Sequence, residues 1–125
     1  MKFRVFDGEK MYYLKDGFHI VLYDDPHKVE WALYSNDDDR LITKADRGGV
    51  LLMDTGLWDM NNNKIWEGDI VFDEGTKTHR EIVWLDNGAQ FIMVDMDEDR
   101  EWDILSEYDK IYVKGNVFEP CSDMM

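Results

Sequence analysis

The sequence contains very little cysteine and histidine, which removes several kinds of chemistry. Cys121 is the single cysteine, so the chain can form no internal disulfide bond. The histidines His19, His27 and His79 show no HxH or HExxH spacing, and one thiol cannot supply a thiolate cluster, so no zinc site is expected. No P-loop, GxSxG or GxGxxG motif occurs, so the sequence offers neither a phosphate cradle nor a nucleophile elbow.

Basic residues are also scarce. The 125-residue chain has 14 Lys and Arg against 28 Asp and Glu, a formal net charge of −14. A nucleic-acid binder must neutralise phosphates with Lys and Arg, and anionic membranes attract basic segments, so neither direct nucleic-acid binding nor a membrane partner is expected. The charge instead favours a basic protein partner, or imitation of a polyanion by the acidic clusters at 37–39, 67–74 and 95–101.

Long apolar runs are missing as well. The nearly apolar run at 50–53 is far too short to span a bilayer. The start, MKFRVFDGEK, lacks the apolar region of a secretory signal peptide. We therefore expect a cytoplasmic protein.

What the sequence does contain is a series of short segments rich in β-branched and aromatic residues, separated by turn residues. In KFRVF (2–6), apolar and charged residues alternate with the period of a half-buried strand. The segment VEWALY (29–34) fits a strand or a helical turn equally well. Residues 1–54 are thus predicted to form a strand-rich appendage, α+β or all-β, which is a candidate for oligomerisation. Its further strands are expected at 11–14, 18–23 and 50–53.

Residues 55–120 are predicted to form a small barrel. The dipeptide Asn87-Gly88 predicts a tight hairpin turn, because these residues tolerate the positive φ that such a turn requires. The spacing of Trp102, Leu105 and Tyr108 predicts one or two helical turns over 101–108. Short consecutive strands with a helical turn before the last one favour a mainly β fold with an SH3-like barrel, followed by a frayed tail at 121–125. The strands of this barrel are expected at 69–73, 78–85, 89–94 and 110–118.

The stretch TGLWDMNNNKIWEGDIVFDEG (55–75) is the most distinctive part of the chain. Glu67 and Asp69 could act as catalytic carboxylates if they met His79 in one pocket, but the sequence shows no recurring arrangement of partners around them. A structural corner explains more. It consists of Trp66, Glu67, Gly68 and Asp69, in which Gly68 permits an unusual backbone conformation and Asp69 bonds nearby backbone N–H groups.

The acidic runs do not complete a calcium loop. An EF-hand needs oxygen ligands at positions 1, 3 and 5, Gly at position 6 and Glu at position 12. The series that starts at Asp95 has Arg100 and Ser106 at the last two positions, and the series that starts at Asp59 has Lys64 and Ile70. We therefore expect no metal site, no cofactor, no catalytic residues and no enzyme activity.

The five tryptophans are predicted to divide between core and surface. Trp66 and Trp84 are expected in the core, because a small protein must bury large side chains to stay folded. Trp58 precedes Asp59 in a polar loop and is expected to be the exposed one. Because exposed aromatics mark interfaces more often than they mark catalysis, Trp58 and Trp31 are the candidate interface residues.

Three segments of the chain together resemble the YopX family of phage and prophage proteins. They are KFRVFDGEKMYYL at the start, TGLWDMNNNKIWEGDIV in the middle and YVKGNVFEP at the end. Family members typically carry a KFRAWD…KMYY-type, a TGLKDKNGKEIYEGDIV-type and an IGNIYENPELL-type segment in the same order. The resemblance implies a C-terminal SH3-type barrel, a phage or prophage origin, hence the cytoplasm of a host cell, and self-association into a homo-oligomer. It implies no catalytic residue and no cofactor.

Two functional hypotheses from different classes follow. The first is a non-catalytic phage or prophage accessory protein that acts through protein–protein contacts, with a host or phage protein as partner. The alternative is an acidic mimic of nucleic acid that occupies a basic host protein.

Overall fold

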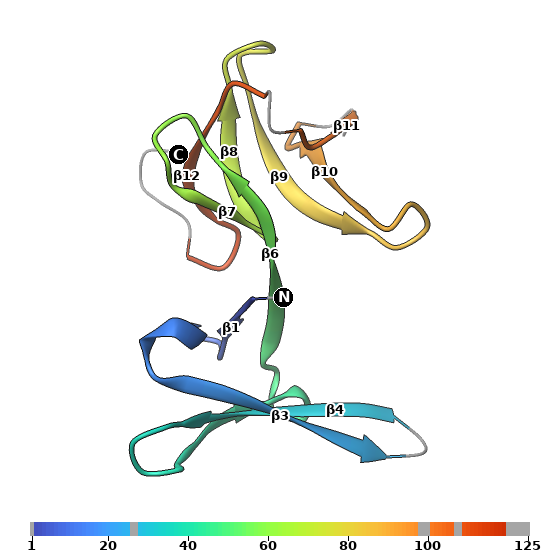
Figure 1. Cartoon of the computed structure of the whole chain (residues 1–125). Coiled ribbons are helices and arrows are strands. Elements are labelled where there is room, and N and C mark those ends of the chain that lie inside the picture. The colour runs from blue at the N-terminus through green and yellow to red at the C-terminus, as the bar shows by residue number, and fades with distance from the viewer. Residues whose placement is uncertain (1, 26–27, 98–100, 107–108, 120–125) are drawn as a thin grey trace. The chain divides into compact units, whose positions relative to one another are not determined.

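The computed structural model describes residues 2–25, 28–97, 101–106 and 109–119, with the side chains of 24, 25, 28 and 29 excepted. Within these residues the chain is mainly β, with twelve strands and two short 3₁₀ turns (Figure 1). It divides into two compact units, Met1–Met53 and Asp54–Met125. The tail at 121–125, including Cys121, lies outside the described residues.

The N-terminal unit contains two antiparallel sheet segments. In one, β1 pairs with β2 and with the first half of β6; in the other, β4 lies between β3 and β5. The ambiguous segment 29–34 belongs to β4 and is therefore a strand. The elements are β1 (Phe3–Phe6), β2 (Met11–Tyr13), η1 (Leu14–Asp16), β3 (Phe18–Asp25), β4 (Lys28–Ser35), β5 (Leu41–Lys44), η2 (Ala45–Arg47) and β6 (Val50–Trp58).

Alternation along β4 places the core of this unit. Trp31 and Leu33 are two residues apart, so they point to the same face of the sheet. They pack with Val5 of β1 into a buried cluster that Tyr12 and Phe18 extend, with those two rings in edge-to-face contact at 5.0 Å between centroids.

The C-terminal unit is a five-stranded antiparallel sheet that curls into a half-barrel (Figure 1). The strand order is β11-β10-β9-β8-β12, and a bulge between Val113 and Gly115 interrupts the pairing of β12 with β8. A bulge increases local twist and so helps a sheet to bend. The elements are β7 (Lys64–Trp66), β8 (Asp69–Asp73), β9 (Thr78–Leu85), β10 (Gln90–Asp95), β11 (Trp102–Ile104) and β12 (Ile111–Asn116).

The core of the C-terminal unit draws one or two side chains from almost every strand. Because strand residues alternate between faces, the curled sheet directs a single set of them inward. The buried residues of this cluster are Ile65, Val71, Ile82, Met93, Leu105 and Ile111.

The predicted hairpin is formed by β9 and β10, but its turn differs from the one expected. The last pair is Leu85 with Gln90, so the loop consists of four residues, 86–89. Asn87 and Gly88 do not adopt positive φ; Ala89 does, at +49°, and its N–H donates to the carbonyl of Asp86 at 3.3 Å. The expectation of positive φ at Asn87 and Gly88 is therefore wrong, because the four-residue loop places its left-handed residue at the end.

Within the described residues, the prediction of helical turns over 101–108 is also wrong. Residues 102–104 form β11, which pairs antiparallel with β10, while Tyr108 lies outside the described residues. The N–H of Asp95 donates to the carbonyl of Glu101, and the N–H of Leu105 donates to the carbonyl of Phe91. The edge of β10 thus provides backbone hydrogen-bond partners for Glu101 and Leu105, which a local helix would not use.

Replacing Ala89 by glycine is expected to stabilise the C-terminal unit. Glycine adopts positive φ without the Cβ clash, so Ala89→Gly should raise the free energy of unfolding by about 0.5–1 kcal/mol in urea denaturation followed by circular dichroism.

The matched control is Ala45→Gly, the same chemical change in η2, where φ is not positive. It should lower stability by roughly 0.5–1 kcal/mol. Stability changes of the same sign in both variants would contradict the assignment of strain to Ala89.

Candidate functional site

The corner at residues 66–69 is held by hydrogen bonds to the main chain. Gly68 adopts φ of +88°, its N–H donates to the carbonyl of Ile82 at 2.8 Å, and its carbonyl accepts from Val117 at 2.9 Å. Asp69 is buried, and its Oδ2 accepts the backbone N–H of Trp66 at 2.8 Å. The carboxylate of Asp69 is therefore bonded to the main chain three residues earlier in the sequence.

The structure does not bring His79 to Asp69. His79 is paired with Phe72 across β8 and β9, and the two rings stack with centroids 5.3 Å apart. Phe72 lies three residues after Asp69 on the same strand, a separation of about 10 Å. The catalytic arrangement considered for Glu67, Asp69 and His79 therefore lacks its base.

A bulge in β6 begins the more informative part of the stretch. Asp54 pairs with Trp66 and Trp58 pairs with Lys64, so β6 carries extra residues between these two pairs. Side chains satisfy the interrupted ladder: Thr55 Oγ1 donates to the carbonyl of Ile65 at 2.6 Å and accepts the N–H of Leu57 at 3.1 Å. The bulge is thus held by side-chain bonds to the backbone.

Asp59 fixes the turn between β6 and β7. Its carboxylate is 6% exposed and accepts four hydrogen bonds: Oδ1 from the N–H groups of Asn61 and Asn63, and Oδ2 from the N–H of Val113 and the amide of Asn63. The three backbone bonds are each 2.8 Å long. Val113 belongs to β12, so one side chain joins a local turn to a strand fifty-four residues away.

The charge of Asp59 is favoured by these donors. Burial raises the pKa of the carboxyl, but the backbone hydrogen bonds from Val113, Asn63 and Asn61 together outweigh burial, and the pKa lies below its usual range. The N–H of Met60 also donates to the carbonyl of Ile111 at 3.0 Å, and Asn62 adopts φ of +62°. The turn therefore has one defined conformation.

This rigid turn displays two apolar side chains to solvent. Trp58 is 55% exposed and Met60 is 52% exposed, on either side of buried Asp59. Lys64 Nζ lies 4.7 Å from the centroid of the Trp58 ring and 2.7 Å from Asp54 Oδ2. The indole is thus held from one side by a cation that a carboxylate positions. We call Trp58 and Met60 together the Trp58 tip.

The other tryptophans lie elsewhere. Trp31 is 9% exposed and packs in the N-terminal core, in contrast to Trp58, so its assignment as an interface residue stays a prediction. Alternation along β4 places Trp31 on the same face as Leu33, which aromatic content alone does not indicate. Trp66 and Trp84 are half-buried, and Trp84 contacts Phe91 edge to face at 4.8 Å between centroids. Trp102 on β11 is 52% exposed.

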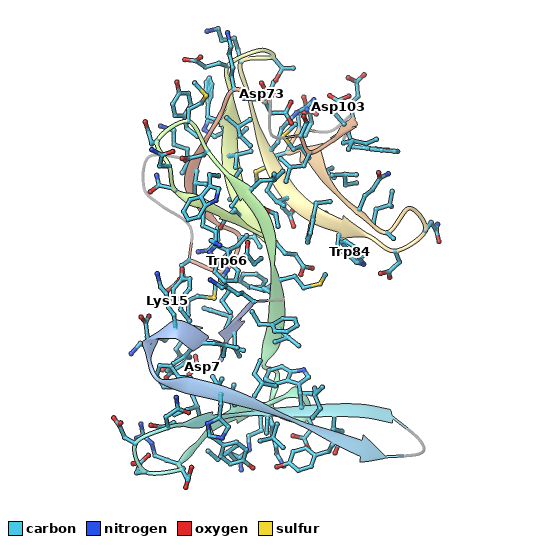
Figure 2. All side chains as sticks on the ribbon, viewed as in Figure 1. Asp7, Lys15, Trp66, Asp73, Trp84 and Asp103 are labelled. Atoms are coloured by element: carbon cyan, nitrogen blue, oxygen red, sulfur yellow. The ribbon has the colours of Figure 1, made fainter. Side chains whose placement is uncertain are left out.

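A buried cation that sequence reasoning missed organises the acidic segments of the C-terminal unit. Arg80 donates through Nε to Asp95 Oδ1 and through NH1 to Asp103 Oδ2 at 2.9 Å, and Asp73 Oδ2 lies 3.6 Å from the same NH1. Figure 2 shows Asp73 and Asp103 together at one end of the curled sheet. The hairpin register could have revealed it, because counting back from Asn87-Gly88 pairs Arg80 with Asp95.

Two of the carboxylates around Arg80 also affect the pKa of the nearby Asp109. Asp109 has a raised pKa because of burial, and the negative charges of Asp73 and Asp103 act in the same direction.

Among the described residues, no group of three or more His, Cys, Asp or Glu is arranged to hold a metal ion. None of the helices in the described part of the chain is long and apolar enough to cross a membrane.

These features define a class of protein. It is a small, mainly antiparallel β protein with two units, and the second unit is a curled half-barrel with a rigid aromatic turn. The sequence model of the YopX family, described as YopX protein, matches residues 2–122, so the chain belongs to the YopX family.

A solved structure agrees with this membership at the level of the fold. The crystal structure of protein yopX from Bacillus subtilis superposes with a TM-score of 0.66 at 23% sequence identity. The match covers 94% of this chain and 93% of that one, so the likeness extends over both units. No curated protein matches the chain.

Replacing Asp59 by asparagine should destabilise the C-terminal unit. Asparagine replaces one of the two accepting oxygens with an NH2 donor, so the N–H groups bonded to that oxygen lose their acceptor, at a cost of about 1–3 kcal/mol in urea denaturation at pH 7. Asp86→Asn in the exposed β9–β10 loop is the control, with an expected change within about 0.5 kcal/mol.

The loss should also depend on pH. Because the folded pKa of Asp59 is depressed, its contribution is fully present above the unfolded value of about 3.9 and disappears as pH falls through the folded pKa. The difference between wild type and Asp59→Asn should therefore shrink as the pH falls below about 4. An unchanged difference down to the acid transition would contradict this role of the charge.

Proposed function

We propose that this chain is a non-catalytic phage or prophage accessory protein that acts through protein–protein contacts made by the Trp58 tip. The observation that carries the proposal is the combination of exposure and rigidity at this turn. Trp58 and Met60 are each more than half exposed, yet the backbone between them is fixed by the hydrogen bonds to Asp59.

Rigid display of apolar groups favours binding for two reasons. Tryptophan and methionine are enriched at interface cores, and tryptophan is among the residues whose truncation most weakens complexes. A turn that is already ordered loses little conformational entropy when a partner covers it. Fold stability alone gives no reason to expose both side chains, since the core cluster is formed by other residues.

Several further assignments belong to the same proposal. The bent five-stranded sheet supports an SH3-like type for the barrel, since short antiparallel strands with strong curvature typify that fold. Family membership supports a phage or prophage origin, hence the cytoplasm of a host cell, and a host or phage protein as partner. The proposal that the chain has no catalytic role rests on the corner at residues 66–69, where the carboxylate of Asp69 accepts a hydrogen bond from the backbone.

Self-association is part of the proposal too. Copies that each carry −14 repel one another, so a homo-oligomer needs an interface that overcomes this repulsion. Higher salt screens such repulsion and should shift the equilibrium toward the oligomer in sedimentation velocity runs at fixed protein concentration. Dissociation on adding salt would instead indicate an interface made of paired charges.

The alternative function, mimicry of nucleic acid, requires carboxylates that are free to act like phosphates. In the C-terminal unit, Asp73, Asp95 and Asp103 surround Arg80, and Asp69 is buried at the corner. This use of acidic residues inside the fold counts against convergence of the 67–74 and 95–101 clusters into a phosphate-like surface. The exposed residues Asp37, Asp38 and Asp39 belong to the N-terminal unit.

Affinity capture tests the proposal. Tagged wild-type protein is incubated with a bacterial host lysate, washed at low and high salt, and the copurifying proteins are identified. We expect a specific partner that survives high salt and whose recovery falls about tenfold or more with Trp58→Ala, the loss of about 1.4 kcal/mol or more that characterises a central interface tryptophan.

Trp102→Ala is the matched control, because Trp102 is equally exposed and lies in the same unit. It should leave capture unchanged. Equal losses in the two variants would contradict a specific role of the Trp58 tip. A basic nucleic-acid enzyme that leaves at high salt would support mimicry instead.

A further inference from the structure

The loop between β9 and β10 contains an Asn-Gly pair that the proposed function does not use. Residues 86–89 are all exposed, and the ladder of the hairpin ends at the pair Leu85 with Gln90. Asn87 and Gly88 occupy the middle of this loop, and neither adopts positive φ. The pair is therefore open to solvent and receives no support from strand pairing.

The backbone nitrogen of Gly88 is free to react. In the part of the chain that the structure describes, its N–H has no hydrogen-bond partner, because the turn bond of this loop runs from Ala89 to the carbonyl of Asp86. The side-chain amide of Asn87 has no partner among those residues either. Glycine carries no side chain that would hinder a close approach to its backbone. Nothing thus holds the nitrogen of Gly88 away from the side chain of Asn87.

Two other asparagines are followed by a backbone N–H that is already bonded. After Asn61, the N–H of Asn62 donates to the carbonyl of Asp59 at 3.1 Å. After Asn62, the N–H of Asn63 donates to Asp59 Oδ1 at 2.8 Å. A nitrogen held in this way cannot turn toward the preceding side chain unless its hydrogen bond breaks first, so the turn that fixes the Trp58 tip also protects its asparagines.

The remaining three asparagines are held by their own side chains. Asn63 Nδ2 donates to Asp59 Oδ2 at 3.4 Å, and Asn36 Oδ1 is hydrogen-bonded to the ring of His19. Asn116 is buried, and its Oδ1 accepts two backbone N–H groups. Of the six asparagines in the chain, Asn87 alone thus combines an unbonded side chain with an unbonded nitrogen after it.

We infer that Asn87 is a site of spontaneous deamidation, in which the backbone nitrogen of Gly88 attacks the side-chain carbonyl carbon. The bond from Gly88 N to Asn87 Cγ forms while the Cγ–Nδ2 bond breaks. The proton of the attacking nitrogen passes through solvent to the departing amine, which leaves as ammonia. The product is a five-membered succinimide ring, and no group is oxidised or reduced.

Water then opens the ring in one of two ways. Attack at Cγ releases the nitrogen of Gly88 from the side chain and leaves aspartate at position 87. Attack at the main-chain carbonyl carbon of residue 87 leaves isoaspartate, in which the main chain runs through Cγ. Both products add a carboxylate beside Asp86, in a chain whose net charge is already −14.

Isoaspartate also lengthens the loop by a methylene group. Exposed loop tips tolerate such insertions, so the hairpin is expected to persist in the product. Older copies of the chain would therefore differ from new ones in the charge and the length of one loop. The inference concerns the chemistry of this loop alone and does not rest on the proposed function.

Peptide mass spectrometry of the full-length protein tests the site. The protein is incubated in a mildly alkaline buffer, sampled over time and digested with trypsin. The tryptic peptide 81–100 contains Asn87 as its one asparagine, and the other asparagines fall in different peptides. Isoaspartate is detected with protein isoaspartyl methyltransferase.

We expect peptide 81–100 to gain the mass that corresponds to replacing NH2 by OH, and to become a substrate of the methyltransferase. The peptides that carry the other asparagines should stay unchanged over the same period, because the folded protein holds them. No mass gain in peptide 81–100, or equal gains in the other peptides, would overturn the inference.

A parallel incubation in guanidinium chloride separates the structural argument from the sequence motif. Because no hydrogen bond holds Gly88, folding should give Asn87 little protection. The rate in the folded protein should lie within about tenfold of the rate in the unfolded chain, a difference in activation barrier of less than about 1.4 kcal/mol. Stronger protection would mean that the folded loop holds the pair, and would contradict the inference.

Two variants test the roles of the two residues. Asn87→Gln keeps a side-chain amide but requires a six-membered ring, so deamidation at position 87 should be lost over the same period. Gly88→Ala places a Cβ next to the attacking nitrogen and should also suppress the reaction. That Cβ would lie 2.8 Å from Gln90 Nε2, the end of a flexible side chain that can move aside.

Both variants are expected to fold, because their positions are exposed and lack positive φ, and circular dichroism checks this. Asn87→Gln keeps the test decisive if Gly88→Ala does not fold. An undiminished mass gain in peptide 81–100 of a folded variant would overturn the assignment of the reaction to this pair.

Discussion

The carboxylate of Asp59 is the interaction on which the form of the C-terminal unit most depends. The curled sheet has two ends in its strand order, β11 and β12, and the β6–β7 hairpin needs an anchor to pack against it. Asp59 supplies that anchor by accepting from Val113 of β12, while its other oxygen closes the turn. Ile65, carried by the same hairpin, then enters the core. A single buried charge thus fixes the local turn and also joins the β6–β7 hairpin to the half-barrel.

Much of this fold is predictable from the sequence where period and turn chemistry agree. The strands at 69–73 and 78–85 have the predicted limits, because apolar alternation and flanking turn residues mark both ends. The predictions for Asn87-Gly88 and for 101–108 are wrong for different reasons: the β9–β10 loop has four residues with Ala89 at positive φ, and residues 102–104 form a strand. Local preference suggested a local structure, but pairing with β10 determined the backbone of Trp102 and its neighbours. Tertiary partners override short-range preference in such short segments.

The candidate sites were predictable only in part. Exposure of Trp58 follows from its polar surroundings, whereas burial of Trp31 follows from the faces of β4, which the sequence left undecided between strand and helix. Arg80 shows no periodic signal, since a buried cation within an apolar strand looks like a solvent-facing residue until its register is known. The hydrogen bond between the hydroxyl groups of Tyr23 and Tyr34, at 2.6 Å, depends on the pairing of β3 with β4, which composition does not indicate.

The way in which Asp59 holds its turn has a consequence for how recognition can change over time. Its backbone partners are the N–H groups of Asn61, Asn63 and Val113, which nearly every residue type possesses. Position 60 contributes its own N–H to the fold, through the carbonyl of Ile111, and its side chain is 52% exposed. Lineages could therefore exchange the residue at position 60 and acquire new binding preferences while the scaffold persists. The same property would make this hairpin a platform for randomised libraries, with Asp59 kept constant.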